Sequence, residues 1–146
     1  MDNLKARGNF NILLIEDNLA DSRMIQEIFK EFNPKTKIHT VDNGFEALKY
    51  LNKKEKYRNT SVPDLIFLDL NIPQINGFEV LKEIKANGKL KNVPVLILTT
   101  STDQKDFLKA QKLQADCFIN KPLDYDEYNT LLRHIDECWL KIKSVK

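Results

Sequence analysis

Residues 63–81 read PDLIFLDLNIPQINGFEVL, and this stretch holds both halves of one strand–helix unit. The run Leu65–Leu68 is continuously apolar, which is typical of a strand buried on both faces of a parallel sheet. Asp69 follows this run, and after a short loop an apolar stripe at helical spacing begins at Phe78. The stretch therefore predicts a buried strand that ends near a carboxylate and is followed by a helix.

The same alternation extends in both directions along the chain. Strand-sized apolar runs lie at residues 12–15, 95–98 and, more weakly, 117–119, while residues 37–41 alternate as an edge strand would. Helical stripes lie between and after them, at Met24–Phe32, Phe45–Leu51, Phe78–Ile84, Phe107–Leu113 and Tyr128–Ile142. Five strand–helix units predict an α/β fold, with a doubly wound five-stranded parallel sheet of (βα)5 type in a three-layer sandwich.

Helix boundaries agree with this order. Asn33-Pro34 and Asn87-Gly88 are stop signals after the first and third helical stripes, and Asp103 is a candidate N-cap for the fourth. We expect one domain over residues 11–143, between short tails at 1–10 and 144–146.

Composition excludes several classes of protein. The net charge of +2, with both signs mixed along the chain, argues against a nucleic-acid binder, and no apolar run is long enough to span a membrane. The polar N-terminus lacks the apolar segment of a signal peptide. Cys117 and Cys138 have no metal-ligand spacing, so we expect two reduced, half-buried thiols in a cytoplasmic protein.

Reactive side chains follow the predicted strands at their carboxyl ends, where open α/β sheets bind ligands. The first strand is followed by Glu16-Asp17, the third by Asp69, the fourth by Thr99-Thr100 and the fifth by Lys121. Three clustered carboxylates repel one another and need a cation, and oxygen ligands of this kind suit Mg²⁺. A lysine and a hydroxyl beside them would suit a phosphoryl group on a carboxylate.

Four stretches together resemble the receiver domains of two-component response regulators, over residues 11–140. They are ILLIEDN at 12–18, PDLIFLDLNIPQINGFEVL at 63–81, VPVLILTTS at 93–101 and CFINKPLD at 117–124. The resemblance implies the flavodoxin-like, CheY-like form of the fold. It also implies a phosphorylation switch that receives its phosphoryl group from a histidine kinase or a histidine phosphotransfer protein.

The resemblance assigns roles residue by residue. Asp69 matches the phosphoacceptor, and Asp17 matches the acid that binds Mg²⁺ directly. Glu16 matches the second acid, which acts through water, and Asn71 matches the position whose backbone carbonyl completes the metal site. Lys121 matches the lysine that contacts the phosphoryl group.

Thr99 and Phe118 match the switch hydroxyl and the aromatic residue that moves with it. Thr100 stands where the family often has alanine, and Phe118 replaces the more usual tyrosine. In the family, the movement of the switch hydroxyl and the aromatic residue reaches a face made by the fourth helix, fifth strand and fifth helix. We expect a homodimer or a partner contact through this face. Trp139 has two open interpretations, as core and as part of that interface.

The segment 53–64, LTTS at 98–101 and CWLKI at 138–142 resemble the small regulators paired with phytochrome-type histidine kinases. Two other functions compete with a binding switch. A phosphohydrolase with an aspartyl-phosphate intermediate would usually carry Asp-x-Asp on the first strand, whereas the acceptor here reads Asp69-Leu70-Asn71. A phosphate shuttle to a histidine phosphotransfer protein has the same motifs as a binding switch, so the shuttle and the switch both stay open. We expect no turnover of a separate substrate.

Overall fold

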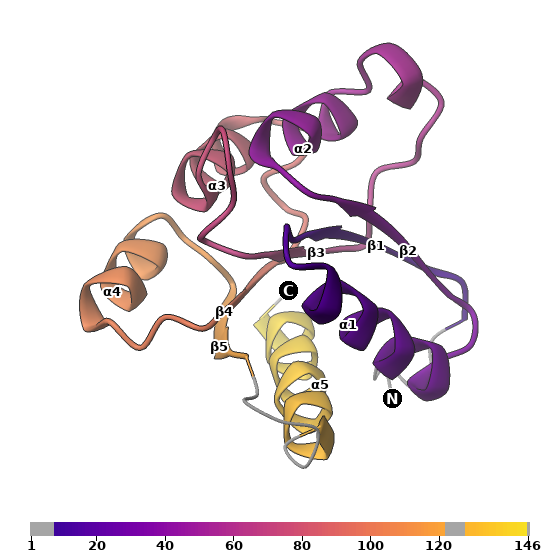
Figure 1. Ribbon diagram of the computed structural model, residues 1–146, viewed down its shortest axis with the longest axis vertical. Coiled ribbons are helices and arrows are strands. Elements are labelled where there is room, and N and C mark those ends of the chain that lie inside the picture. The colour runs from indigo at the N-terminus through magenta and orange to yellow at the C-terminus, as the bar shows by residue number, and fades with distance from the viewer. Residues whose placement is uncertain (1–7, 122–127, 146) are drawn as a thin grey trace.

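The computed structural model describes residues 8–121 and 128–145, and there it forms one five-stranded parallel sheet with helices on both faces (Figure 1). The strands run in the order β2-β1-β3-β4-β5, so β2 and β5 are the edges. The elements are β1 (Phe10–Ile15), α1 (Leu19–Phe32), β2 (Thr36–Val41), α2 (Gly44–Leu51), the short 3-10 helix η1 (Glu55–Tyr57), β3 (Leu65–Leu68), α3 (Gly77–Ala86), β4 (Val95–Thr99), α4 (Gln104–Lys112), β5 (Cys117–Asn120) and α5 (Tyr128–Val145). The predicted doubly wound three-layer fold is confirmed.

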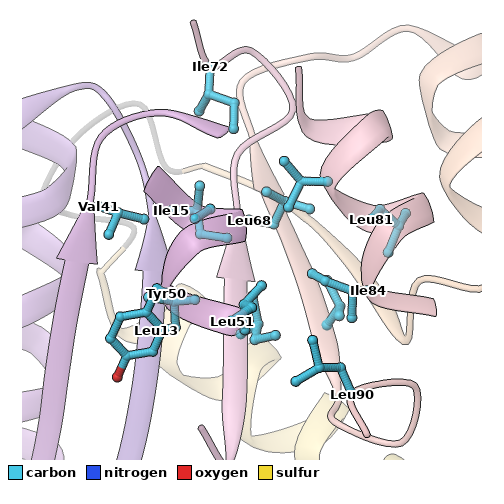
Figure 2. Packing of buried hydrophobic residues seen from close by; sticks show 14 of the residues in the cluster. Leu13, Ile15, Val41, Tyr50, Leu51, Leu68, Ile72, Leu81, Ile84 and Leu90 are labelled. Atoms are coloured by element: carbon cyan, nitrogen blue, oxygen red, sulfur yellow. The ribbon is translucent and has the colours of Figure 1, made fainter. Parts of the chain in front are cut away.

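Two apolar cores lie on opposite faces of the sheet. The core under α1 and α5 contains Ile25 and Phe29 from α1 with Leu131 and Ile135 from α5. The other core lies under α2 and α3 and includes Leu51, Leu81 and Ile84; Figure 2 shows it against β1 and β3. β3 contributes to both cores and all four of its residues are fully buried, because it is central in the sheet.

Side-chain caps begin the first four α-helices. The side chains of Asn18, Asn43, Asn76 and Asp103 accept hydrogen bonds from the backbone N–H groups of the first turns of α1 to α4. Each cap satisfies a donor that has no partner inside its helix. The predicted cap at Asp103 and the predicted stops at Asn33 and Asn87 are confirmed.

Trp139 belongs to the core. Its side chain is 2% exposed, and its ring meets the ring of Phe10 edge-on at a centroid distance of 5.1 Å. Ile142 is also buried, whereas Leu140 on the same helix is 36% exposed. The interpretation of Trp139 as an interface residue is therefore wrong, because α5 turns this stripe of its surface toward β1.

The two cysteines are joined. Cys117 on β5 and Cys138 on α5 form a disulfide, with their Cα atoms 6.2 Å apart. Both residues are half-buried as predicted, but the prediction that they are reduced thiols is wrong for this structure. Their separation of 21 positions along the chain concealed the pair, because only the packing of α5 against β5 brings them together.

The segment after α2 folds back along that helix. Tyr57 in η1 is buried against the rings of Tyr50 and His39, at centroid distances of 5.2 and 5.7 Å. Lys49 and Lys56 form ion pairs that connect η1 with α2.

β1 begins at Phe10 and α5 ends at Val145, while the domain limits 11–143 stay a prediction. No helix in the described ranges is long and apolar enough to cross a membrane.

Candidate functional site

The sheet itself aligns the residues predicted to form the site. The backbone N–H of Asp69 donates to the carbonyl of Ile15 at 3.0 Å, one residue past the paired ends of β1 and β3. The N–H of Lys121 donates likewise to the carbonyl of Thr99 at 2.8 Å, just past β5. Parallel pairing therefore carries the sequence-predicted side chains to the same edge of the sheet, the one at the carboxyl ends of its strands.

Three acids gather at this edge. Glu16, Asp17 and Asp69 each offer a carboxylate oxygen, and the three oxygens lie within 4.8 Å of one another. Glu16 and Asp69 are buried, with 3% and 7% of their surface exposed, whereas Asp17 is open to solvent. Hard oxygen donors at this density, with one side open to water, fit a divalent cation.

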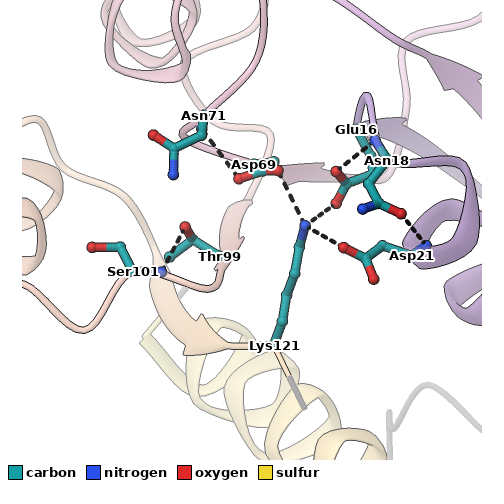
Figure 3. A network of polar contacts seen from close by, with 8 residues as sticks. All are labelled: Glu16, Asn18, Asp21, Asp69, Asn71, Thr99, Ser101 and Lys121. Atoms are coloured by element: carbon teal, nitrogen blue, oxygen red, sulfur yellow. Dashed lines mark hydrogen bonds and ion pairs between the residues drawn. The ribbon is translucent and has the colours of Figure 1, made fainter. Parts of the chain in front are cut away.

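Lys121 is the cation that this structure places among the acids. Its Nζ atom lies 3.1 Å from Oδ2 of Asp69, 2.5 Å from Oε1 of Glu16 and 2.9 Å from Oδ2 of Asp21 (Figure 3). An ammonium group has three donors, and all three are directed at carboxylates. The side chain of Lys121 is 4% exposed, so these contacts are made largely without water.

Burial and charge shift the pKa values of this pair. Burial raises the pKa of Glu16 to about 7, and the nearby carboxylate of Asp69 adds to that rise, while the hydrogen bond from Lys121 opposes it. Burial alone would lower the pKa of Lys121, but its hydrogen bonds to Glu16 and Asp21 outweigh that effect and raise it. Lys121 thus stays charged across the physiological range, while Glu16 is poised to take up a proton near neutral pH.

The loop after β3 folds back over Asp69. The N–H of Asn71 donates to Oδ1 of Asp69 at 3.1 Å, so both oxygens of this carboxylate have partners. Gly77, at the start of α3, lies so close that a Cβ atom there would be 2.6 Å from the carbonyl oxygen of Asp69. Only a residue without a side chain permits this approach, which explains the glycine in the motif.

Thr99 lies at the end of β4 and is fully buried. Its hydroxyl accepts a hydrogen bond from the N–H of Ser101 at 3.2 Å, and the hydroxyl of Ser101 donates to Asp106 on α4 at 2.6 Å. The carbonyl of Ser101 also accepts a hydrogen bond from the side chain of Asn120, at the end of β5. Thr99 is therefore connected through one residue to both α4 and β5.

Phe118 lies on the edge strand β5. It is half-buried, and its ring meets that of Phe107 on α4 at 5.4 Å. A surface cavity of about 540 Å³ lies beside it, lined by Phe118, Ile119, His134, Glu137, Cys138, Leu140 and Lys141. The aromatic residue of the predicted switch therefore joins the described parts of α4, β5 and α5.

Two residues of this arrangement were missed in the sequence. Asp21 lies four positions after Asp17, in the first turn of α1, where an acid is usually explained by the helix dipole. Ser101 looked like an ordinary loop residue between β4 and α4. The distance of Asp21 from Lys121, 100 positions along the chain, left no local signal of their pairing.

Known proteins resemble the chain over most of its length. Residues 12–133 match the response regulator receiver domain. The chain is 37% identical to response regulator Rcp1 of a Synechocystis species over 130 residues, which cover 89% of this chain and 88% of that protein.

Two solved structures extend the comparison. The phosphorylated cyanobacterial phytochrome response regulator RcpA superposes with a TM-score of 0.85 at 40% identity, over 91% of this chain and 95% of that one. The Mn²⁺-bound form of Rcp1 superposes with a TM-score of 0.83 at 37% identity, over 90% and 94%. The chain therefore belongs to the response regulator receiver domain family, whose members carry signals in two-component systems.

Proposed function

We propose that this chain is a phosphorylation switch whose phosphoacceptor is Asp69. The observation that supports this assignment most strongly is the contact of 3.1 Å between the buried carboxylate of Asp69 and the ammonium group of Lys121. An oxygen of Asp69 would attack the phosphorus atom of a phosphohistidine, forming a P–O bond while the P–N bond breaks. The imidazole leaves with the bonding electron pair and takes up a proton.

Lys121 would serve the transferred group. Its three donors are already directed into the acid cluster, so Lys121 needs only a small movement to exchange a carboxylate partner for a phosphoryl oxygen. A positive charge held there lowers the energy of the charged oxygens during transfer. Asp21 is a positioning residue in this proposal, because it holds the same ammonium group that contacts Asp69.

We assign the divalent cation as Mg²⁺. Asp17, Asp69 and the backbone carbonyl of Asn71 would hold it directly, and Glu16 through water. Bound Mg²⁺ supplies positive charge that neutralises the phosphoryl oxygens during transfer. The acid cluster supports this choice because Mg²⁺ prefers hard oxygen donors and keeps several waters, for which exposed Asp17 leaves room.

Thr99 and Phe118 would convert phosphorylation into a change of surface. The hydroxyl of Thr99 would turn toward the phosphoryl oxygens, which lengthens its contact with Ser101 and disturbs the bond between Ser101 and Asp106. α4 would then shift against β5, and Phe118 would move into the space vacated by Thr99. The two surfaces need differ by only a few kcal/mol for phosphorylation to change their populations.

The partner that supplies the phosphoryl group is, in our proposal, a histidine kinase of the phytochrome type. Similarity to RcpA, described as a cyanobacterial phytochrome response regulator, supports this choice. Phosphotransfer should be faster from a phytochrome-type kinase than from an unrelated histidine kinase at equal concentration. Equal rates from both kinases would contradict the pairing.

The acceptor itself is tested with acetyl phosphate and Mg²⁺, followed by intact-mass spectrometry. Wild-type protein should gain one phosphoryl group, Asp69→Asn should gain none, and a chelator should abolish labelling of the wild type. Asp42→Asn is the matched control, because Asp42 is an exposed acid after β2 outside the three-acid cluster. Full labelling of Asp69→Asn would refute the assignment.

Incubation with small phosphomonoesters should release no phosphate, since the switch turns over no separate substrate.

Self-association would use the face made by α4, β5 and α5. Among the described residues of this face, the exposed large apolar side chains are Leu108 on α4 and Leu140 on α5, at 53% and 36%, while Trp139 is buried in the core. Sedimentation with and without beryllofluoride, a phosphoryl mimic, should show a larger dimer fraction with it. A monomer under both conditions would leave this face to a different partner.

A further inference from the structure

The disulfide lies at the join between the sheet and the last helix. Cys117 is the first residue of β5, an edge strand, and Cys138 lies in the second half of α5. The bond closes a covalent ring that contains both Phe118 and Lys121. It therefore links α5 to the strand that holds Phe118 and is followed directly by Lys121.

The fold accommodates these cysteines without the bond as well. Both residues pack at the margin of the core under α1 and α5, where a reduced cysteine behaves as a small apolar side chain. Leu131, Ile135 and Trp139 hold α5 against the sheet, and all three are buried. The bond thus restrains a contact that apolar packing already makes, so both oxidation states are compatible with a folded chain.

The two cysteines are not enclosed in the core. Cys117 and Cys138 are each half-buried, and Cys138 lines the cavity of about 540 Å³ beside Phe118. A small thiol can enter a surface cavity of this size, whereas it cannot reach a disulfide in a closed core. Accessible disulfides exchange with small thiols more readily than enclosed ones.

We propose that Cys117 and Cys138 form a reversible redox modification site that controls the mobility of β5 and α5. In the reducing direction, a glutathione thiolate attacks one sulfur, the S–S bond breaks and a mixed disulfide forms. A second glutathione thiolate then releases the protein thiolate and leaves as glutathione disulfide. Two electrons pass to the protein, and the two protons from the glutathione thiols end on Cys117 and Cys138.

The oxidised chain holds α5 covalently against β5, and the reduced chain holds it by packing alone. Oxidation therefore stiffens the surface around Phe118, and reduction frees it to move. The consequence for partner binding rests on the proposed function. The modification itself does not, so it is tested without phosphorylation, and the two proposals can fail separately.

The experiment places the folded chain in buffers with a graded ratio of reduced to oxidised glutathione. Free thiols are alkylated and counted by intact mass, and amide exchange is followed in β5 and α5. The fluorescence of Trp139, the single tryptophan and the neighbour of Cys138, gives a second readout. The double variant Cys117→Ala, Cys138→Ala is the control, since alanine also fits a half-buried site at the core margin.

We expect the wild type to convert fully and reversibly between the two forms. Amides of β5 and α5 should exchange more slowly in the oxidised form, and its melting temperature should be higher by roughly 10 °C, given the size of the closed loop. The double variant should show none of these changes. A bond that glutathione does not open in the folded chain, a bond that does not re-form, or equal exchange in both forms would each overturn the proposal.

Discussion

Glu16→Gln in the metal-free protein tests the electrostatics of the acid cluster. Glu16 is 3% exposed, and its pKa is about 7 in the folded chain against an ordinary value of 4.5. The folded-state pKa lies above the unfolded one, so the neutral carboxyl favours folding at low pH. This contribution is complete below pH 4.5 and is lost as the pH rises through 7. Glutamine is neutral throughout and mimics the protonated side chain.

The size of the effect follows from that shift. Between about pH 5 and about pH 8 the wild type should lose roughly 2–3 kcal/mol of stability through Glu16. Glu16→Gln should not lose this part, so its free energy of unfolding should rise relative to wild type by that amount. Urea denaturation at the two pH values, with a chelator present, measures the difference. Titrating groups outside the cluster of Glu16, Asp69 and Lys121 cancel between the two proteins.

A matched control and a metal titration complete this test. Glu83→Gln changes an exposed glutamate on α3 outside the cluster, so its difference from wild type should not depend on pH. Mg²⁺ should return stability to the wild type at about pH 8 and should stabilise Glu16→Gln less. A difference between Glu16→Gln and wild type that is the same at both pH values would refute the reasoning.

Two further substitutions probe the framework around the site. Gly77→Ala should cost about 1–3 kcal/mol of stability and slow acetyl-phosphate labelling, because its Cβ would press on the backbone of Asp69. The control Gly88→Ala has open space around it and should leave the stability measured by urea denaturation nearly unchanged. Trp139→Ala should lower the free energy of unfolding by about 3–5 kcal/mol, because it leaves a cavity beside Phe10. The folded variant should still accept a phosphoryl group as the wild type does. A variant of unchanged stability that fails only in self-association would show that Trp139 is an interface residue.

Periodic features were the predictable part of the fold. The apolar runs that became β1, β3 and β4 are continuous because those strands are covered on both faces, and the capping residue Asp103 has a local chemical signature. The same parallel order brings Glu16, Asp69 and Lys121 to one edge. Their meeting could therefore be predicted from where each strand ends.

Features that depend on packing between distant segments were not predictable. The disulfide needs Cys117 on β5 and Cys138 on α5 to lie side by side, and neither cysteine has a local sequence signal that identifies its partner. The burial of Trp139 is only partly a feature of this kind, because Trp139 belongs to the apolar stripe at residues 128–142. Asp21 illustrates the limit at the site, because its role depends on the reach of a lysine 100 positions away.

The central claim is that Asp69 carries the phosphoryl group, and chemical trapping tests it most directly. The chain is phosphorylated with acetyl phosphate and Mg²⁺, reduced with borohydride, digested and sequenced by mass spectrometry. Borohydride converts an aspartyl phosphate into homoserine, so the modified residue is read from the peptide. We predict homoserine at position 69 and at no other aspartate. Homoserine at position 17 or 21, with residue 69 unchanged, would contradict the account.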